Sequence, residues 1–240
     1  MKSSLLFVAA LTAASVWGAT GSGYTLQGGA QYVSPGNNSN RAVKLTANIG
    51  NTTPTDDYSV IDFGVSSGLT FADLNNLSTD YKFIEGTCGG GSPRFQINLL
   101  DPNTNTVKNV FVYIGPAPNY TGCPMNIWQN SGNLLAAGKT VDTTQLGGTF
   151  YQSVADAQAA YGSYQVTGIQ LVADTFGATQ TVLVDNVRIN STVYTFEADS
   201  KEACKDGGWQ NFTFAPGPFK NQGDCVSYFA TGGKNKGSGD

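Results

Sequence analysis

Apolar and polar side chains alternate along much of the chain, as they do in strands that bury one face. In residues 94–99, RFQINL, the side chains of Phe95, Ile97 and Leu99 would lie on one face and three polar side chains on the other. A second alternating run follows at residues 109–114, and the segment between the two runs, DPNTNTVK, is rich in turn formers. We therefore predict a β-hairpin here.

Further runs of this kind recur between clusters of Gly, Pro and Asn. Short patterned runs with such turns are typical of an antiparallel β-sandwich or barrel. The predicted strands are Gln31–Val33, Arg41–Asn48, Tyr58–Val65, Tyr81–Glu85, Arg94–Leu99, Asn109–Ile114, Tyr164–Ala173, Thr179–Val184, Val187–Asn190 and Val193–Glu197. Two brief helical patterns lie between them, at residues 70–77 and 151–162.

The first residues have the order of a secretory signal peptide. One basic residue, Lys2, precedes the apolar run Leu5–Leu11, and small residues follow up to Ala19. The apolar run is too short to span a bilayer. We predict a signal peptide at residues 1–19 and a secreted protein, extracellular or associated with a cell wall.

Composition narrows the choice of partners. Charged residues make up 12% of the chain, and the net charge of −4 offers no basic surface for nucleic acid or an anionic membrane. We expect a monomer that binds neither. Six N-x-S/T sequons make the protein a glycoprotein if its host glycosylates, at Asn37, Asn51, Asn76, Asn119, Asn190 and Asn211.

Four cysteines remain after the signal peptide, and an even number in an exported chain predicts two disulfides. Three pairings are open. We favour Cys88–Cys123 and Cys204–Cys225 because each pair brackets a compact segment. A zinc site is the alternative, but the cysteines lack C-x-x-C spacing and the chain has no histidine.

The C-terminal residues form a separate predicted unit. Residues 20–198 would be the β-sandwich domain, 199–233 two short helices held together by the second disulfide, and 234–240 a disordered tail. About forty residues bury little surface alone, which is why a disulfide is expected in this unit.

The segment CKDGGWQNFTFAPGPFKNQGDCVSYFATGGK is similar to a C-terminal cysteine-hairpin motif of uncharacterised exported proteins. The stretches GSPRFQI, VFVYIGPAPNYTGC and VLVDNVRIN resemble the β-sandwich domains that precede that motif. More loosely, VLVDNVRIN looks like the closing strand of jelly-roll carbohydrate-binding modules. The resemblance implies export and an all-β, antiparallel sandwich of jelly-roll type, and it implies no activity.

The glycine run Gly89–Gly91 invites comparison with a phosphate-binding loop. Such a loop follows a strand, opens a helix and carries a lysine, whereas this run precedes a strand. We interpret it as a connection beside a disulfide.

The polar face of the predicted hairpin is the main candidate ligand site. It would present Arg94, Gln96 and Tyr113, which Gln170 from a later strand could join. A guanidinium and an amide bind hydroxyls or carboxylates, and an aromatic ring covers the apolar face of a sugar. The alternative is a solvated sheet face with no ligand. Trp128, Tyr120 and Tyr81 are candidate platforms on loops.

Asp185 interrupts the apolar run VLVDNVRI. In jelly-roll modules an acidic residue near this position holds a structural calcium, so the resemblance suggests calcium bound by Asp185. The alternative is a β-bulge or a strand-end turn made by Asp185 and Asn186. We expect no other cofactor.

Several enzyme classes are excluded or disfavoured. Without histidine, Ser-His-Asp and Cys-His mechanisms are impossible. A glycoside hydrolase would need two carboxylates, for which Glu85 and Glu197 are the candidates, and a polysaccharide lyase could use Arg94, Gln96 and Tyr113 but would lack the histidine. We favour a non-catalytic protein that binds a polysaccharide or cell-wall glycan. The alternatives are such a lyase or hydrolase, or a structural wall protein with no ligand.

Overall fold

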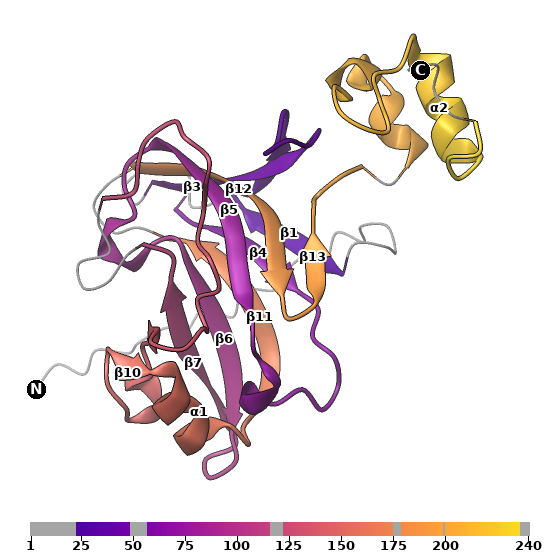
Figure 1. Ribbon diagram of the computed structural model, residues 1–240. Helices are drawn as coiled ribbons and strands as arrows, with labels where there is room; N and C mark the ends of the chain where they lie inside the picture. Colours follow the sequence, from indigo (N-terminus) through magenta and orange to yellow (C-terminus); the bar gives the residue numbers. More distant parts are fainter. Residues whose placement is uncertain (1–22, 49–56, 116–121, 175–178, 199, 236–240) are drawn as a thin grey trace, which may run out of the picture.

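The computed structural model describes residues 23–48, 57–115, 122–174, 179–198 and 200–235, so the predicted signal peptide and Tyr120 lie outside the described residues. Two antiparallel sheets pack face to face (Figure 1). The five-stranded sheet has the order β1 (Tyr24–Gly28), β4 (Ser59–Phe63), β11 (Gln165–Ala173), β6 (Arg94–Asp101) and β7 (Thr106–Tyr113). The predicted antiparallel sandwich of jelly-roll type is confirmed.

The second sheet is six-stranded. Its order is β2 (Gln31–Val33), β3 (Ala42–Asn48), β12 (Thr179–Ile189), β5 (Leu77–Glu85) and β8 (Gln129–Asn130), with β13 (Thr192–Tyr194) also paired to β12. The segments predicted as two strands, 179–184 and 187–190, form the single strand β12. It passes through a shift of register between Asp185 and Arg188, with Asn186 at φ 47°. The predicted bulge is therefore present.

The alternating pattern places the core as predicted. Phe95, Ile97 and Leu99 on β6 are fully buried between the sheets, together with residues of β7, β11, β5 and β12. β6 and β7 form the predicted hairpin, in which Arg94 pairs with Tyr113 and Gln96 with Phe111. Because directly paired residues share a face, the polar residues of both strands point away from the core.

Short elements fill the loops where helical patterns were predicted. A 3-10 turn, η2 (Phe71–Asp73), begins after Thr70, whose backbone N–H and hydroxyl both donate to Asp73. The helix α1 (Val154–Tyr161) is capped by the Ser153 hydroxyl and ends at Gly162. Between β7 and α1, the short strands β9 (Thr140–Val141) and β10 (Gln152–Ser153) flank the 3-10 turn η4 (Thr144–Leu146).

The C-terminal unit consists of η5 (Lys201–Cys204), η6 (Gly208–Asn211) and α2 (Gln222–Ala230), and Figure 1 shows it beside one end of the sandwich. It has a small core of its own around Phe212, Phe219 and the Cys204–Cys225 disulfide. Both predicted disulfides are confirmed, the other joining Cys88 and Cys123. In the predicted disordered tail, Asn235 is hydrogen bonded to α2, and residues 236–240 lie outside the described part. None of the helices in the described ranges is long and apolar enough to cross a membrane.

The predicted glycosylation sites differ in accessibility. The Nδ2 atoms that would carry a glycan donate hydrogen bonds at Asn37, to Asp80 (2.9 Å), and at Asn190, to the Asp73 carbonyl (3.0 Å). Asn211 is exposed, while Asn51 and Asn119 lie outside the described residues. A glycan at Asn37 or Asn190 would therefore have to displace a hydrogen bond.

Candidate functional site

A continuous strip of polar side chains crosses the outer face of the five-stranded sheet. Strand register brings them side by side: Asp62 on β4 pairs with Gln170 on β11, which pairs with Gln96 on β6. Gln27 on β1 extends the strip at one edge and Asn98 on β6 widens it. The three spacings between these four neighbouring strands make it roughly 14 Å long. We call these five residues the polar strip.

The side chains of the polar strip bind one another. Gln96 Nε2 donates to Gln170 Oε1 (3.1 Å) and to Asn98 Oδ1 (3.3 Å). Gln170 Nε2 and Gln27 Nε2 both donate to Asp62 Oδ2 at 3.4 Å. The amides are therefore held in fixed orientations by other members of the strip, as a pre-organised hydrogen-bonding surface requires.

Arg94 lies beside the strip but is already engaged. Its guanidinium forms a bidentate ion pair with Asp174, and Nη1 also donates to the Gly91 carbonyl (3.2 Å). It stacks over the Phe111 ring, with Cζ 4.9 Å from the ring centre. Because Asp174 neutralises this guanidinium, Arg94 is poorly suited to neutralise the uronate carboxylate that a lyase must bind.

The side chain of Tyr113 packs against the glycine run Gly89–Gly91. Its hydroxyl donates to Asp142 Oδ2 (2.8 Å), and its ring passes over Gly91, where a Cβ atom would stand 2.7 Å from Tyr113 Cε1. Gly91 also has φ +77°, a conformation that side chains disfavour. The run is thus a connection shaped to admit the Tyr113 ring. It is a 3-10 turn, Gly89–Gly91, that precedes a strand and opens no helix.

Two aromatic side chains, Phe150 and Tyr151, lie beside Tyr113 on β7, which pairs with Arg94, two residues along β6 from Gln96 in the strip; we call these two the aromatic ledge. Phe150 stacks on Tyr113 with ring centres 5.5 Å apart, and Tyr151 meets Phe150 edge to face at 4.7 Å. Phe150 and Tyr151 are 40% and 47% exposed and lie side by side, so together they form an apolar surface that a ligand can reach. Sequence reasoning missed both residues. The available signal was an aromatic pair placed between Gly147–Gly148 and the start of a helix.

The other predicted platforms do not join this surface. Trp128 lies beside Lys82 on the six-stranded sheet, with the Lys82 ammonium 5.5 Å from its ring. The prediction that Tyr81 is a loop platform was wrong, because Tyr81 lies within β5 with 7% of its surface exposed. Burial raises the pKa of its phenol.

Asp185 is the centre of a buried hydrogen-bonding network. Its Oδ2 accepts from the Asn37 backbone N–H (2.8 Å) and the Ser39 hydroxyl (2.5 Å), and its Oδ1 accepts from the Asn186 N–H (2.7 Å). Burial raises the pKa of Asp185 to about 6, against the lowering effect of these three donors, and the charge of Asp80 adds to the rise.

The hydrogen-bond donors around Asp185 are poorly suited to a calcium site. Calcium takes six to eight oxygen ligands, whereas backbone N–H groups and a hydroxyl point at Asp185. Among the described residues no cluster of three or more acidic, Cys or His side chains is placed to hold a metal. The contacts favour the bulge, and calcium at Asp185 stays a prediction.

The two glutamates considered for hydrolysis lie far apart. Glu85 pairs with Thr181, which pairs with Thr46 on β3, whereas Glu197 binds the backbone N–H and the side chain of Asn40. Six residues of extended chain separate Thr46 from Asn40, roughly 20 Å. Glycosidase carboxyl pairs stand about 5 to 10 Å apart, so Glu85 and Glu197 do not form such a pair.

Comparison with known proteins identifies no family. Neither models of protein families nor curated proteins match the sequence. Among solved structures, the agarase AgWH50C is similar at a TM-score of 0.36 and 10% identity over 78% of this chain. An exo-beta-agarase is similar at a TM-score of 0.37 and 15% identity over 72%. The chain spans about a quarter of the length of either structure (24% of each), and likenesses this distant carry no argument about activity.

Proposed function

We propose that the protein is a non-catalytic glycan-binding module, and that a polysaccharide or cell-wall glycan lies along the polar strip with one sugar against the aromatic ledge. The observation that carries this proposal is the continuity of the surface. Amide and carboxylate groups on four strands, β1, β4, β11 and β6, lead to two exposed aromatic rings beside β7. Amides and carboxylates bind sugar hydroxyls, and aromatic rings cover apolar sugar faces.

The length of the surface favours an oligosaccharide over a single sugar. A strip roughly 14 Å long can contact several sugar units at once. Such a ligand must lie across the strands, because the polar strip runs from β1 to β6 along the pairing direction. Binding would then depend on residues at both ends of the surface.

The chemistry of the strip supports binding over catalysis. Arg94 is neutralised by Asp174, and Glu85 and Glu197 lie at different ends of a sheet. A lyase or hydrolase remains the alternative and has a different signature, the release of unsaturated uronates or new reducing ends.

The test is retention of the mature, oxidised protein on insoluble and soluble polysaccharides, including cellulose, chitin, xylan, pectin and agarose, with products assayed in the same tubes. The variants are Gln96→Ala combined with Gln170→Ala, and Phe150→Ala. The matched control is Ile84→Ala, which removes a side chain of equal exposure (40%) from the other sheet. Thermal melting verifies that each variant is folded.

We expect retention without products, weakened roughly tenfold or more in both test variants and unchanged in Ile84→Ala. The double glutamine variant loses hydrogen bonds that contribute about 1 kcal/mol each, and Phe150→Ala loses an aromatic contact of about 1 kcal/mol together with buried apolar area. Retention with products would replace this proposal by the lyase or hydrolase alternative. Retention that both test variants keep would place the ligand elsewhere. Absence of retention on every glycan would favour the structural alternative.

A further inference from the structure

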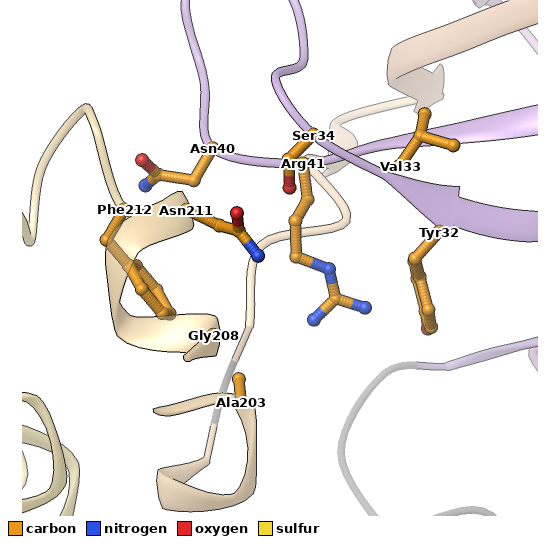
Figure 2. A pocket seen from close by; sticks show the side chains of 9 residues that line it. All are labelled: Tyr32, Val33, Ser34, Asn40, Arg41, Ala203, Gly208, Asn211 and Phe212. Carbon is orange, nitrogen blue, oxygen red and sulfur yellow. The ribbon is translucent and has the colours of Figure 1, made fainter. Parts of the chain in front are cut away.

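A cavity distinct from the polar strip lies between the sandwich and the C-terminal unit. It has a volume of about 430 Å³, within the range of small-molecule sites. Figure 2 shows its two walls, one from the sandwich and one from the C-terminal unit. The lining residues are Tyr32, Val33, Ser34, Asn40 and Arg41 on the first wall and Ala203, Gly208, Asn211 and Phe212 on the second.

Arg41 is the single charged residue in this lining. Its guanidinium stacks on the Tyr32 ring, with Cζ 3.7 Å from the ring centre, and points into the cavity (Figure 2). Within the described part of the chain, no carboxylate lies within ion-pair distance of it. Stacking holds the plane of the guanidinium and leaves its N–H groups, which lie in that plane, directed at whatever occupies the cavity.

This contrasts with Arg94, whose charge is neutralised by Asp174. The Asn211 side chain extends toward Arg41 from the opposite wall, and Ser34 lies above them (Figure 2). The cavity therefore combines one uncompensated positive charge with an amide and a hydroxyl.

The two walls are fastened together by Asn40, which is 1% exposed. Its backbone N–H donates to Glu197 (2.7 Å), its Nδ2 donates to the Ala215 carbonyl (2.9 Å), and its Oδ1 accepts from the Phe214 N–H (2.7 Å). The Cys204–Cys225 disulfide stiffens the second wall. Fixed walls reduce the entropy lost when a ligand binds.

We propose that this cavity binds the anionic group of an acidic saccharide, a carboxylate or a sulfate ester, on Arg41, with sugar hydroxyls on Asn211 and Ser34. The anion is inferred from the unpaired guanidinium, whose fork matches an oxyanion with two parallel hydrogen bonds. The saccharide rests on the proposed function. The C-terminal unit would then complete a binding site rather than serve only as a cap.

The experiment measures binding of three probes to the full mature chain by calorimetry: trigalacturonate, its neutral methyl ester, and a sulfated galactose trisaccharide. Protein from a bacterial periplasm is used, since a glycan on the exposed sequon at Asn211 would fill the cavity. Arg41→Gln removes the charge, and Arg41→Lys keeps it without the fork. Arg188→Gln is the matched control, since Arg188 is also half-buried and forms no ion pair among the described residues.

We expect an acidic probe to bind more tightly than the neutral ester, and Arg41→Gln to weaken that binding tenfold or more, as hydrogen bonds to charged groups do. Arg41→Lys should fall in between, and Arg188→Gln should bind as the unaltered protein does. The acidic probe that binds more tightly identifies carboxylate or sulfate as the natural group. Equal binding of acid and ester, or an Arg41→Gln variant that binds normally, overturns the proposal.

Asn211→Asp provides a second test that alters no buried group. The new carboxylate would pair with Arg41 across the cavity and should abolish binding of acidic probes at unchanged melting temperature. Gln96→Ala/Gln170→Ala separates the two proposals. If that variant binds acidic probes normally while polysaccharide retention never occurs, the proposed function fails and the cavity site stands.

Discussion

The buried Asp185 carboxyl should make the protein less stable as the pH rises from about 4 to about 7. Its pKa is 3.8 in an unfolded chain and about 6 in the folded protein, chiefly because of burial. Between these values the folded state binds more protons than the unfolded state, so the free energy of unfolding falls with rising pH. The stabilisation is complete below pH 4 and lost once the pH passes through the folded value.

The expected size follows from the shift itself. A rise from 3.8 to about 6 corresponds to about 3 kcal/mol, at about 1.4 kcal/mol per pKa unit. This free energy is not reduced for screening by solvent, because Asp185 has no exposed surface. The pKa values of Asp73, Asp101 and Glu202 are lowered in the folded protein, so the stability that these groups contribute rises with pH instead of falling. They titrate mainly below pH 4.5. Asp185 should therefore dominate between pH 5 and pH 7.

The assay is urea unfolding at half-unit steps of pH from 4 to 7, with both disulfides intact. A Trp209→Phe background leaves Trp128 as the fluorescent reporter of the sandwich. Asp185→Asn is the perturbation. It should cost about 1 to 3 kcal/mol, more at pH 4 than at pH 7, because its NH₂ group cannot accept the hydrogen bonds that Asp185 accepts and because the variant lacks the proton-linked stabilisation present at low pH.

The pH dependence of the free energy of unfolding shows whether Asp185 acts through its titration or only through its hydrogen bonds. In Asp185→Asn the fall between pH 5 and pH 7 should disappear, whereas in the control Asp73→Asn it should persist. A flat or rising profile in the unaltered protein would refute the reasoning, and so would an equal fall in Asp185→Asn.

Three further predictions concern glycine, disulfide and metal. Gly91→Ala should destabilise the protein by roughly 1 to 3 kcal/mol in urea unfolding, because its Cβ would meet the Tyr113 ring. The control Gly68→Ala is also at positive φ (+80°) but has open space around it, so it should cost less; equal costs would show that the contact with Tyr113 does not matter. Replacing Cys204 and Cys225 by serine should lose about 3 kcal/mol from the C-terminal unit, seen as faster proteolysis there, and an unchanged rate would show that the small core suffices. Calcium or EDTA should leave the melting temperature unchanged, and a rise of several degrees with calcium would establish a calcium site.

The alternation of apolar and polar residues predicted the features that depend on neighbouring residues alone, namely the strands and their buried faces. Alternation located β6 and β7 and their buried faces, because a half-buried strand must place every second side chain in the core, although the strands extend two and three residues further toward the turn than predicted. The apolar run around Asp185 was harder. The sequence pattern divided it into two strands, whereas β12 continues through a bulge that shifts the register and leaves both halves paired with β5. The first strand, β1, escaped prediction because it is short and mostly exposed.

The surfaces that matter for binding depend on register between distant segments. Asp62 was not considered for the polar strip, since its place beside Gln170 follows from pairing between strands 108 residues apart. The ion pair of Arg94 with Asp174, across 80 residues, changes the chemistry that the sequence suggested for that arginine. The cavity at Arg41 depends on Asn40 reaching Glu197 and Ala215, over 157 and 175 residues.

These hydrogen bonds within the protein also determine what kind of binding each surface can give. On the polar strip a glycan hydroxyl must replace bonds that Gln96, Gln170 and Asp62 already make with one another, so each exchange gains little free energy. A glycan whose hydroxyls match the fixed amides can replace these bonds. A glycan whose hydroxyls do not match leaves an amide without a partner, so the strip would supply selectivity. Affinity would come from the aromatic ledge, whose two side chains are 40% and 47% exposed, and from Arg41, which forms no ion pair among the described residues. Removing the ledge should therefore weaken retention on all glycans alike, whereas altering the strip should weaken retention and also change the order of preference among glycans.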